Sequence, residues 1–197
     1  MKVICRKEMW SATDSFLFRT MTASPGKINM KAVRTEKEVK ELLKKMTIIC
    51  DTREQVNENI TGYLDKNKLP YISRKLDVGD YSFDVDGLTF SDSIAIERKA
   101  SIDEIAGNFT VGRQRFENEF LRAKANGIKV VLLIEDCSWE KIKSHDYRSK
   151  LKPQSLIATL LSWQVRYNIT IIFCKAKDSG ELIYGTCYYW LKNYLEH

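Results

Sequence analysis

The sequence of 197 residues lacks the features that mark membrane and secreted proteins. No stretch approaches the roughly 18 uninterrupted apolar residues that a membrane-spanning helix needs. The N-terminus has no apolar segment followed by a cleavage site, as a secretory signal peptide would have. Internal repeats and low-complexity tracts are absent as well. We therefore expect a soluble, cytoplasmic protein with no membrane partner.

The chain also lacks cysteine spacings that are typical of a metal site. Its five cysteines show no CxxC or similar pattern. They are Cys5, Cys50, Cys137, Cys174 and Cys187. Three of them lie in or beside apolar runs, so we expect reduced, structural thiols. Of the two histidines, His145 lies in a polar stretch and is expected at the surface, and His197 is given no function.

What the chain does contain is enough apolar material for one core. Hydrophobic residues make up 44% and charged residues 29%, as in globular proteins. The net charge of +6 suits a polyanionic partner, but many proteins without such a partner share it. Residues 1–46 are more polar and are expected to form an N-terminal appendage that ends in a charged helix. Residues 47–194 form the predicted domain, and residues 195–197 look like a tag remnant.

Hydrophobic periodicity predicts strands that alternate with helices. The strands are expected at 47–50, 71–72, 81–85, 93–97, 129–135 and 169–174, and the helices at 35–46, 57–67, after Ser101, at 112–126, 153–167 and 179–194. The run 129–135 is almost wholly apolar, as in a strand covered on both faces. This order predicts an α/β fold with a mixed central sheet and helices on both sides.

Charged residues gather where the predicted strands begin and end. Asp51 follows the strand 47–50, Asp80 begins a predicted hairpin around Asp86-Gly87, and Glu97 ends it. Carboxylates brought together in this way could hold a hard cation such as Mg²⁺. A bound cation of that kind activates water and neutralises charge on a phosphate during phosphodiester hydrolysis.

Three basic residues accompany these carboxylates. Lys99 lies two positions after Glu97, so strand alternation places both side chains on one face, where an ammonium can orient water. Arg53 offers a planar fork that suits a phosphate, and Arg98 points to the other face unless the strand has already ended. The alternative is that these residues are ordinary surface charges in salt bridges.

Together these residues resemble a known motif. The segments that carry the resemblance are Asp51-Thr52-Arg53-Glu54, Gly79-Asp80-Tyr81, Glu97-Arg98-Lys99 with Asp103 four positions later, Gly112-Arg113 and Leu132-Leu133-Ile134-Glu135. They are similar to the XPF/Hef family of structure-specific DNA endonucleases over about residues 47–194. The resemblance implies a restriction-endonuclease-like fold of the PD-(D/E)XK type. It also implies Mg²⁺- or Mn²⁺-dependent cutting of branched DNA such as flaps, forks and recombination intermediates.

The matching positions imply a role for each motif residue. The catalytic set would be Asp51, Arg53, Glu54, Asp80, Glu97, Arg98, Lys99 and Asp103. Within it Asp80 and Glu97 would be the principal metal ligands, with Asp51 adding to the acidic pocket, and Lys99 would position water. Contacts to DNA are expected from Arg53, Arg98, Arg113 and Arg115, although a solvated helix face explains the last two equally well.

Some expectations concern partners and setting. The 17 positions from Asp80 to Glu97 suggest a reshaped loop. No tandem helix-hairpin-helix domain follows residue 194, and in this respect the chain resembles the compact versions of the family from phages and prophages. This resemblance suggests a role in repair or recombination in a bacterial cell or infected host. Surplus aromatic residues on the helices 153–167 and 179–194 suggest a homodimer. Alternatives are a vestigial DNA-junction binding module, or a nuclease for RNA or simple duplexes.

Overall fold

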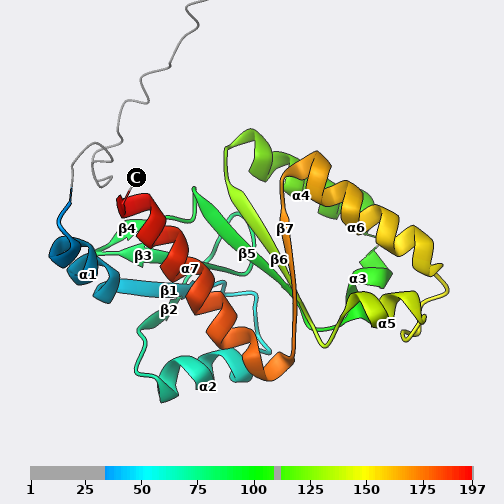
Figure 1. The fold of residues 1–197 in the computed structure, drawn as a ribbon, viewed down its shortest axis with the longest axis horizontal. Coiled ribbons are helices and arrows are strands. Elements are labelled where there is room, and N and C mark those ends of the chain that lie inside the picture. Colours follow the sequence, from blue (N-terminus) through cyan, green and yellow to red (C-terminus); the bar gives the residue numbers. More distant parts are fainter. Residues whose placement is uncertain (1–33, 109–111, 197) are drawn as a thin grey trace, which may run out of the picture.

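The computed structural model describes residues 34–108 and 112–196, which form a mixed sheet covered by helices on both faces (Figure 1). The strands are β1 (Met46–Cys50), β2 (Tyr71–Ser73), β3 (Tyr81–Val85), β4 (Leu88–Thr89), β5 (Ile94–Lys99), β6 (Lys129–Glu135) and β7 (Thr170–Cys174). The helices are α1 (Glu36–Lys44), α2 (Glu58–Lys66), α3 (Ile102–Asn108), α4 (Arg113–Ala125), α5 (Trp139–Lys143), α6 (Pro153–Tyr167) and α7 (Ser179–Glu196), with a 3-10 turn, η1 (Ala176–Asp178). The predicted α/β class with a mixed central sheet is confirmed.

The strand order is β2-β1-β3-β5-β6-β7, with β4 paired to the far end of β3. β5, β6 and β7 run parallel, whereas β3 is antiparallel to both β1 and β5. β6 therefore lies between two parallel neighbours, and its last six residues are buried. This matches the apolar run that predicted a strand covered on both faces.

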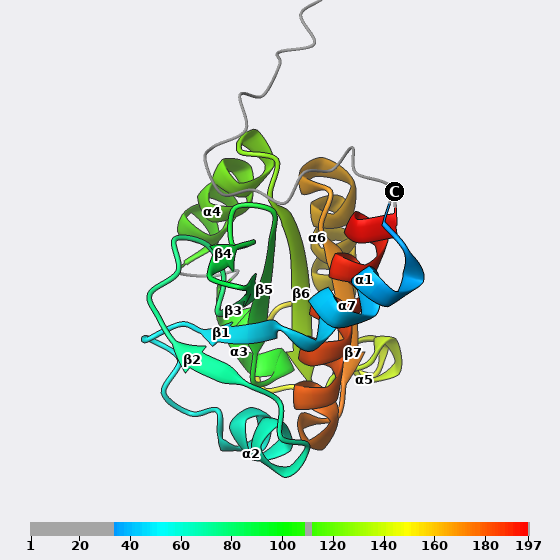
Figure 2. The same cartoon turned by 90° about the vertical axis from the view of Figure 1, so that its left-hand side faces the viewer.

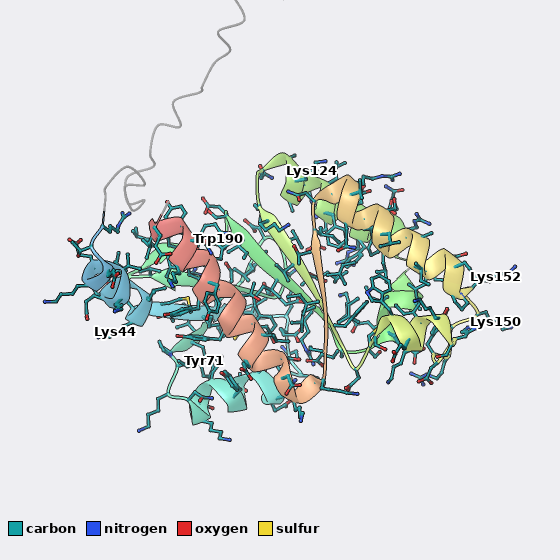
Figure 3. The ribbon with its side chains drawn as sticks, viewed as in Figure 1. Lys44, Tyr71, Lys124, Lys150, Lys152 and Trp190 are labelled. Atoms are coloured by element: carbon teal, nitrogen blue, oxygen red, sulfur yellow. The ribbon has the colours of Figure 1, made fainter. Side chains whose placement is uncertain are left out.

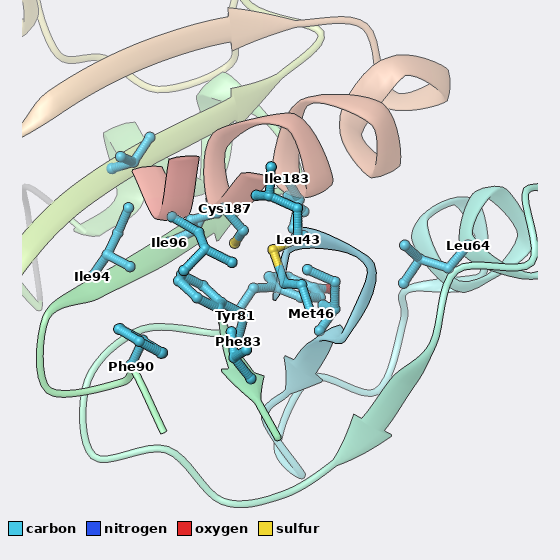
Figure 4. Packing of buried hydrophobic residues seen from close by; sticks show 14 of the residues in the cluster. Leu43, Met46, Leu64, Tyr81, Phe83, Phe90, Ile94, Ile96, Ile183 and Cys187 are labelled. Carbon is cyan, nitrogen blue, oxygen red and sulfur yellow. The ribbon is translucent and has the colours of Figure 1, made fainter. Parts of the chain in front are cut away.

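The sheet separates two apolar cores, and β5 contributes to both. Ile94 and Ile96 pack with α1, α2 and α7, and Figure 4 shows this core between the sheet and α7. Ala95 instead faces α3, α4, α5 and α6. Because side chains alternate along a strand, residues 97–99 of β5 also point in turn to the two faces of the sheet. Glu97 and Lys99 thus belong to the α3–α6 face, and Arg98 to the α2–α7 face.

Helix α1, which the sequence placed at the end of the appendage, packs in the first core. Thr35 forms a capping box with Glu38, and this reciprocal pair of hydrogen bonds starts the helix. Val39 and Leu43 lie one turn apart and are both buried, and α1 lies beside α7 (Figure 2). The rest of the predicted appendage, residues 1–33, lies outside the described residues.

Two short elements were not expected. After the Asp86-Gly87 turn, in which both residues have positive φ, the chain pairs with β3 through β4 before it continues to β5. Ser138 caps the N-terminus of α5, which buries Ile142 but is only five residues long. In neither case is the apolar pattern long enough to show a period.

Several other expectations concern the chain as a whole. Within the described residues, no helix is both long and apolar enough to cross a membrane. Cys50, Cys137 and Cys187 are buried and Cys174 is half-buried, and these four described cysteines form no disulfide. Cys5 lies outside the described residues. His145 is exposed, as expected, and its ring Nε2 donates a hydrogen bond to the Ser149 carbonyl.

Candidate active site

Asp80 is held against the end of β5, next to Glu97. Tyr81 pairs with Ile96, so the residue before Tyr81 meets the residue after Ile96 across the sheet. The Asp80 N–H donates to the Ile96 carbonyl at 2.8 Å. The Arg98 N–H donates to the Asp80 carboxylate, also at 2.8 Å. The backbone of β5 therefore fixes both the position and the orientation of the Asp80 side chain.

Gly79 makes this approach possible. Its φ of +71° lies in the left-handed region, which side chains with a Cβ rarely adopt. A Cβ at this position would lie 2.9 Å from the Ile96 carbonyl oxygen and 3.1 Å from the Ala95 Cβ. The turn before Asp80 thus requires glycine for two separate reasons.

Lys99 lies on the same face as Glu97, as the strand alternation predicted. Its ammonium is 2.7 Å from Glu97 Oε1 and 3.3 Å from Glu104 Oε1. It also lies 5.1 Å from the centre of the Phe116 ring. The side chains of Lys99 and Glu97 are only 11% and 10% exposed, so this ion pair is shielded from water. A shielded pair is much less weakened by salt than a surface pair.

Burial and proximity change the acidity of these groups. Burial and the Glu97 carboxylate raise the pKa of Asp80 to about 8. Burial also raises the pKa of Glu97, although Lys99 opposes the change. Burial disfavours the Lys99 ammonium, but Glu97 and Glu104 outweigh it and raise the Lys99 pKa. Two buried carboxylates that resist being charged together are the kind of site that a divalent cation neutralises.

The donor set fits a hard cation with few protein ligands. In the described part of the chain, no three His, Cys, Asp or Glu side chains converge as a ready-made metal site. Mg²⁺ usually binds through one or two carboxylates and keeps several waters. Asp80 and Glu97 supply such a pair.

Asp51 lies beside Asp80, because its N–H donates to the Asp80 carbonyl at 2.7 Å, but its carboxylate has other partners. Its carboxylate accepts hydrogen bonds from the Arg53 N–H at 2.7 Å and from the Arg53 guanidinium at 2.7 Å and 3.1 Å. It also accepts one from the Leu76 N–H. Burial opposes its charge, but these donors outweigh burial and hold the Asp51 pKa below its usual range. Arg53 also donates to the Leu76 carbonyl at 2.9 Å. Asp51 and Arg53 together anchor the loop that leads to Gly79.

Arg98 faces the opposite side of the sheet and is 8% exposed. Its guanidinium contacts Glu54 at 2.6 Å and Glu135 at 2.7 Å. Glu135 also accepts hydrogen bonds from Asn59 and Ser179. These five residues form a buried polar network that joins β5 and β6 to α2 and α7. In this structure the Arg98 guanidinium is therefore occupied by Glu54 and Glu135.

Asp103 points away from the carboxylate pair toward the segment after α5. It accepts hydrogen bonds from the Arg148 N–H at 2.7 Å and from the Arg148 Nε at 3.0 Å. These contacts hold the pKa of Asp103 below its usual value. Asp103 thus holds the loop after α5 in place through Arg148.

The predicted DNA contacts on α4 are exposed. Arg113 pairs with Glu117 on the same helix at 2.9 Å, and Arg115 is exposed. Both can reach a ligand outside the protein.

Two acidic residues near Lys99 were not among the sequence candidates. Glu104 contacts the ammonium, and its Ser101 capping signal was visible in the sequence. Glu119 on α4 accepts a weak hydrogen bond from the Gly79 N–H at 3.4 Å, and its charge raises the pKa of Glu97. Nothing in the local sequence distinguishes Glu119 from the other polar positions of its helix, because only the tertiary fold brings α4 to this turn.

Comparison with known proteins gives a consistent result. The sequence profile of the ERCC4 domain matches residues 50–186. Two solved structures of XPF from Aeropyrum pernix, one of them a complex with DNA, share this fold with a TM-score of 0.57 each and identities of 23% and 22%. They match 73% and 75% of this chain, which spans 64% and 66% of theirs. Comparison with curated proteins found no match.

Proposed function

The chain belongs to the ERCC4 domain family, and from this premise we propose that it is a metal-dependent endonuclease acting on branched DNA. Flaps, forks and recombination intermediates are the proposed substrates, in repair or recombination in a bacterial cell or phage-infected host. The observation that carries the proposal is the buried cluster of Asp80, Glu97 and Lys99 at the junction of β3 and β5.

In the proposed reaction Asp80 and Glu97 would hold Mg²⁺ or Mn²⁺. The bound cation supplies an activated water and neutralises charge on the phosphate. The Arg98 N–H keeps the Asp80 carboxylate in place before any cation binds. Lys99 offsets the charge of Glu97 and has further donors with which to orient a water. Asp51 supports the site through the loop before Gly79.

Contacts to DNA are proposed for the exposed arginines of α4, Arg113 and Arg115. The positive net charge and the DNA complex of one relative support a DNA substrate. Phosphate contacts of this kind position a nucleic acid without reading its sequence. This suits an enzyme that recognises the shape of a branch.

A homodimer is proposed as the working assembly. Leu161 and Val165 on α6 are 48% and 85% exposed, and Leu121 on neighbouring α4 is 55% exposed. Tyr189 on α7 is 62% exposed. Tyr189 lies on the other face of the sheet, whereas the exposed apolar side chains of the neighbouring helices α4 and α6 favour a protein interface there.

The decisive experiment is a cleavage panel of flaps, forks, four-way junctions and linear duplexes, with Mg²⁺ or Mn²⁺. Wild-type protein should cut at least one branched substrate, and Asp80→Asn or Lys99→Gln should lower the rate by about 10²-fold or more without loss of binding. Glu58→Gln is the control, because Glu58 is exposed on α2, on the other side of the sheet. Equal rates in wild-type and Asp80→Asn protein would contradict the site.

Calorimetric titration with Mn²⁺ separates this proposal from a vestigial binding module. A working site should bind Mn²⁺ in wild-type protein and lose it in Asp80→Asn. Binding of branched DNA without any binding of Mn²⁺ would favour the module instead.

A further inference from the structure

The segment between α5 and α6 carries a concentration of positive charge. We call residues 143–152 the basic loop. Its cationic residues are Lys143, Arg148, Lys150 and Lys152, all exposed, against one acidic residue, Asp146. The proposed active site does not use any of them. Figure 3 shows Lys150 and Lys152 at the end of the molecule formed by α5 and α6.

The basic loop has a fixed shape despite its polar sequence. The Tyr147 hydroxyl donates to the Leu151 carbonyl at 2.6 Å, and both side chains pack against the core on the α3–α6 face. The His145 ring bonds to the Ser149 carbonyl at 2.9 Å and lies 4.4 Å from the Tyr147 ring. A loop that is already ordered loses little conformational entropy when it binds a partner.

The lysines of the basic loop are not neutralised by the neighbouring carboxylates that the structure describes. Among the described residues, the ammonium groups of Lys143, Lys150 and Lys152 take part in no ion pair. On α1, by contrast, Lys40 and Lys44 each pair with a glutamate of the same helix. The charge of the basic loop is therefore available to an external anion.

The basic loop is tied to the proposed active site through Asp103. Helix α3 begins three residues after Lys99, on the same face of the sheet as Glu97. Asp103 on α3 binds both the backbone and the side chain of Arg148. This bidentate contact sets the basic loop beside the helix that follows the catalytic strand.

From this placement we propose that the basic loop is a contact surface for the phosphate backbone of a duplex arm of the DNA substrate. Lys150 and Lys152 contact phosphates directly, and Asp103 positions the loop through Arg148. The inference rests on the proposed function, because it names the surface that holds the substrate of that same site. It also explains how a motif carboxylate can serve catalysis without facing the metal.

The test is the salt dependence of binding to a fluorescent fork DNA, measured by anisotropy in EDTA so that no cleavage occurs. Lys150→Gln with Lys152→Gln should weaken binding by roughly tenfold and lower the slope of log K against log salt by about 1 for each phosphate that is no longer bound. The control pair is Lys66→Gln with Lys68→Gln. These lysines are also exposed and two positions apart, but they lie at the end of α2 on the other face. This pair should leave the Kd and the slope unchanged.

The outcomes distinguish the surface from the enzyme activity. A Lys150/Lys152 variant with the wild-type Kd and slope overturns the inference, even if the protein cuts DNA. Equal weakening by the Lys66/Lys68 pair also overturns it, because the effect would then follow net charge alone. Wild-type protein that shows the expected contrast between the two pairs, yet cuts no substrate with Mg²⁺ or Mn²⁺, supports the surface and contradicts the proposed nuclease.

Discussion

At the scale of single residues, the segment 97–99 divides its work between the two faces of the sheet. Glu97 and Lys99 form a shielded ion pair on one face, and Arg98 is buried with two carboxylates on the other. The peptide between these faces also matters, since the Arg98 N–H holds Asp80. One short strand end therefore provides a proposed metal ligand, its counter-charge and the support for a second proposed ligand.

Gly79→Ala should destabilise the protein by about 3 kcal/mol, because it combines left-handed strain with a backbone clash. Urea denaturation measures the effect. Gly185→Ala is the matched control, since Gly185 lies inside α7 and has no atom within 4 Å of the added Cβ. This control should gain roughly 0.5–1 kcal/mol from helix propensity. A neutral result for Gly79→Ala would show that the turn can rearrange.

Asp80 should make the metal-free protein less stable as the pH rises. Its folded pKa of about 8 lies above the usual value near 3.8, so in this window the folded protein binds more protons than the unfolded chain. Stability should fall between about pH 4 and about pH 8, and Asp80→Asn should remove much of that fall. Thermal unfolding in EDTA across this range tests the prediction. An Asp80→Asn variant less stable than wild type at pH 8 would contradict it.

At the scale of elements, the buried network around Arg98 joins β5 and β6 to α2 and α7. The network unites strand ends with helices that are distant in sequence, so it supports the α2–α7 side of the sheet. Arg53 makes similar contacts, but its side chain is 59% exposed. The two arginines of the motif are therefore expected to differ in their effect on stability.

Arg98→Met should destabilise the protein by about 3–5 kcal/mol, because it leaves Glu54 and Glu135 buried without a cation. Arg53→Met should cost less, since water partly replaces the hydrogen bonds that its guanidinium makes. Adding Glu135→Met to Arg98→Met should recover part of the loss, because one unpaired charge is removed. Denaturant titration of the three variants tests this order, and equal losses for Arg98→Met and Arg53→Met would refute it.

The sequence predicted helices and strands well where the hydrophobic periodicity was visible. It predicted the roles of side chains less well where the contacting residue is distant in the sequence. The apolar run 129–135 and the helical spacing of 153–167 specify β6 and α6 almost to the residue. The direction of Lys99 also followed from alternation. Asp103 could not be placed in the same way, because its partner Arg148 is 45 positions away and belongs to a loop. The same limit hid Glu119.

At the scale of the whole molecule, the predicted family and the restriction-endonuclease-like fold are confirmed by the comparisons. The sheet places the active-site cluster, the arginines of α4 and the basic loop on the α3–α6 side. Helices α1, α2 and α7 cover the other side. The proposed metal ligands and the proposed DNA contacts of α4 and the basic loop therefore lie on the same side of the sheet.

The homodimer proposal predicts that Leu161→Glu with Val165→Glu yields a monomer. Burying two carboxylates at the interface would cost free energy, whereas in the monomer they stay in contact with water. Light scattering at micromolar concentration gives the mass of wild type and variant. Val56→Glu is the control, since Val56 is 72% exposed on the α2 side. A monomeric wild-type protein would defeat the proposal.

The opposite directions of Arg98 and Lys99 have a practical consequence. Because the proposed cleavage site and the structural network lie on different faces, we expect a substitution at Lys99 to abolish cleavage without disturbing the network. A fluorescently tagged Lys99→Gln protein would then remain bound where the active protein cuts. Such a protein would serve as an imaging probe for DNA branches in cells.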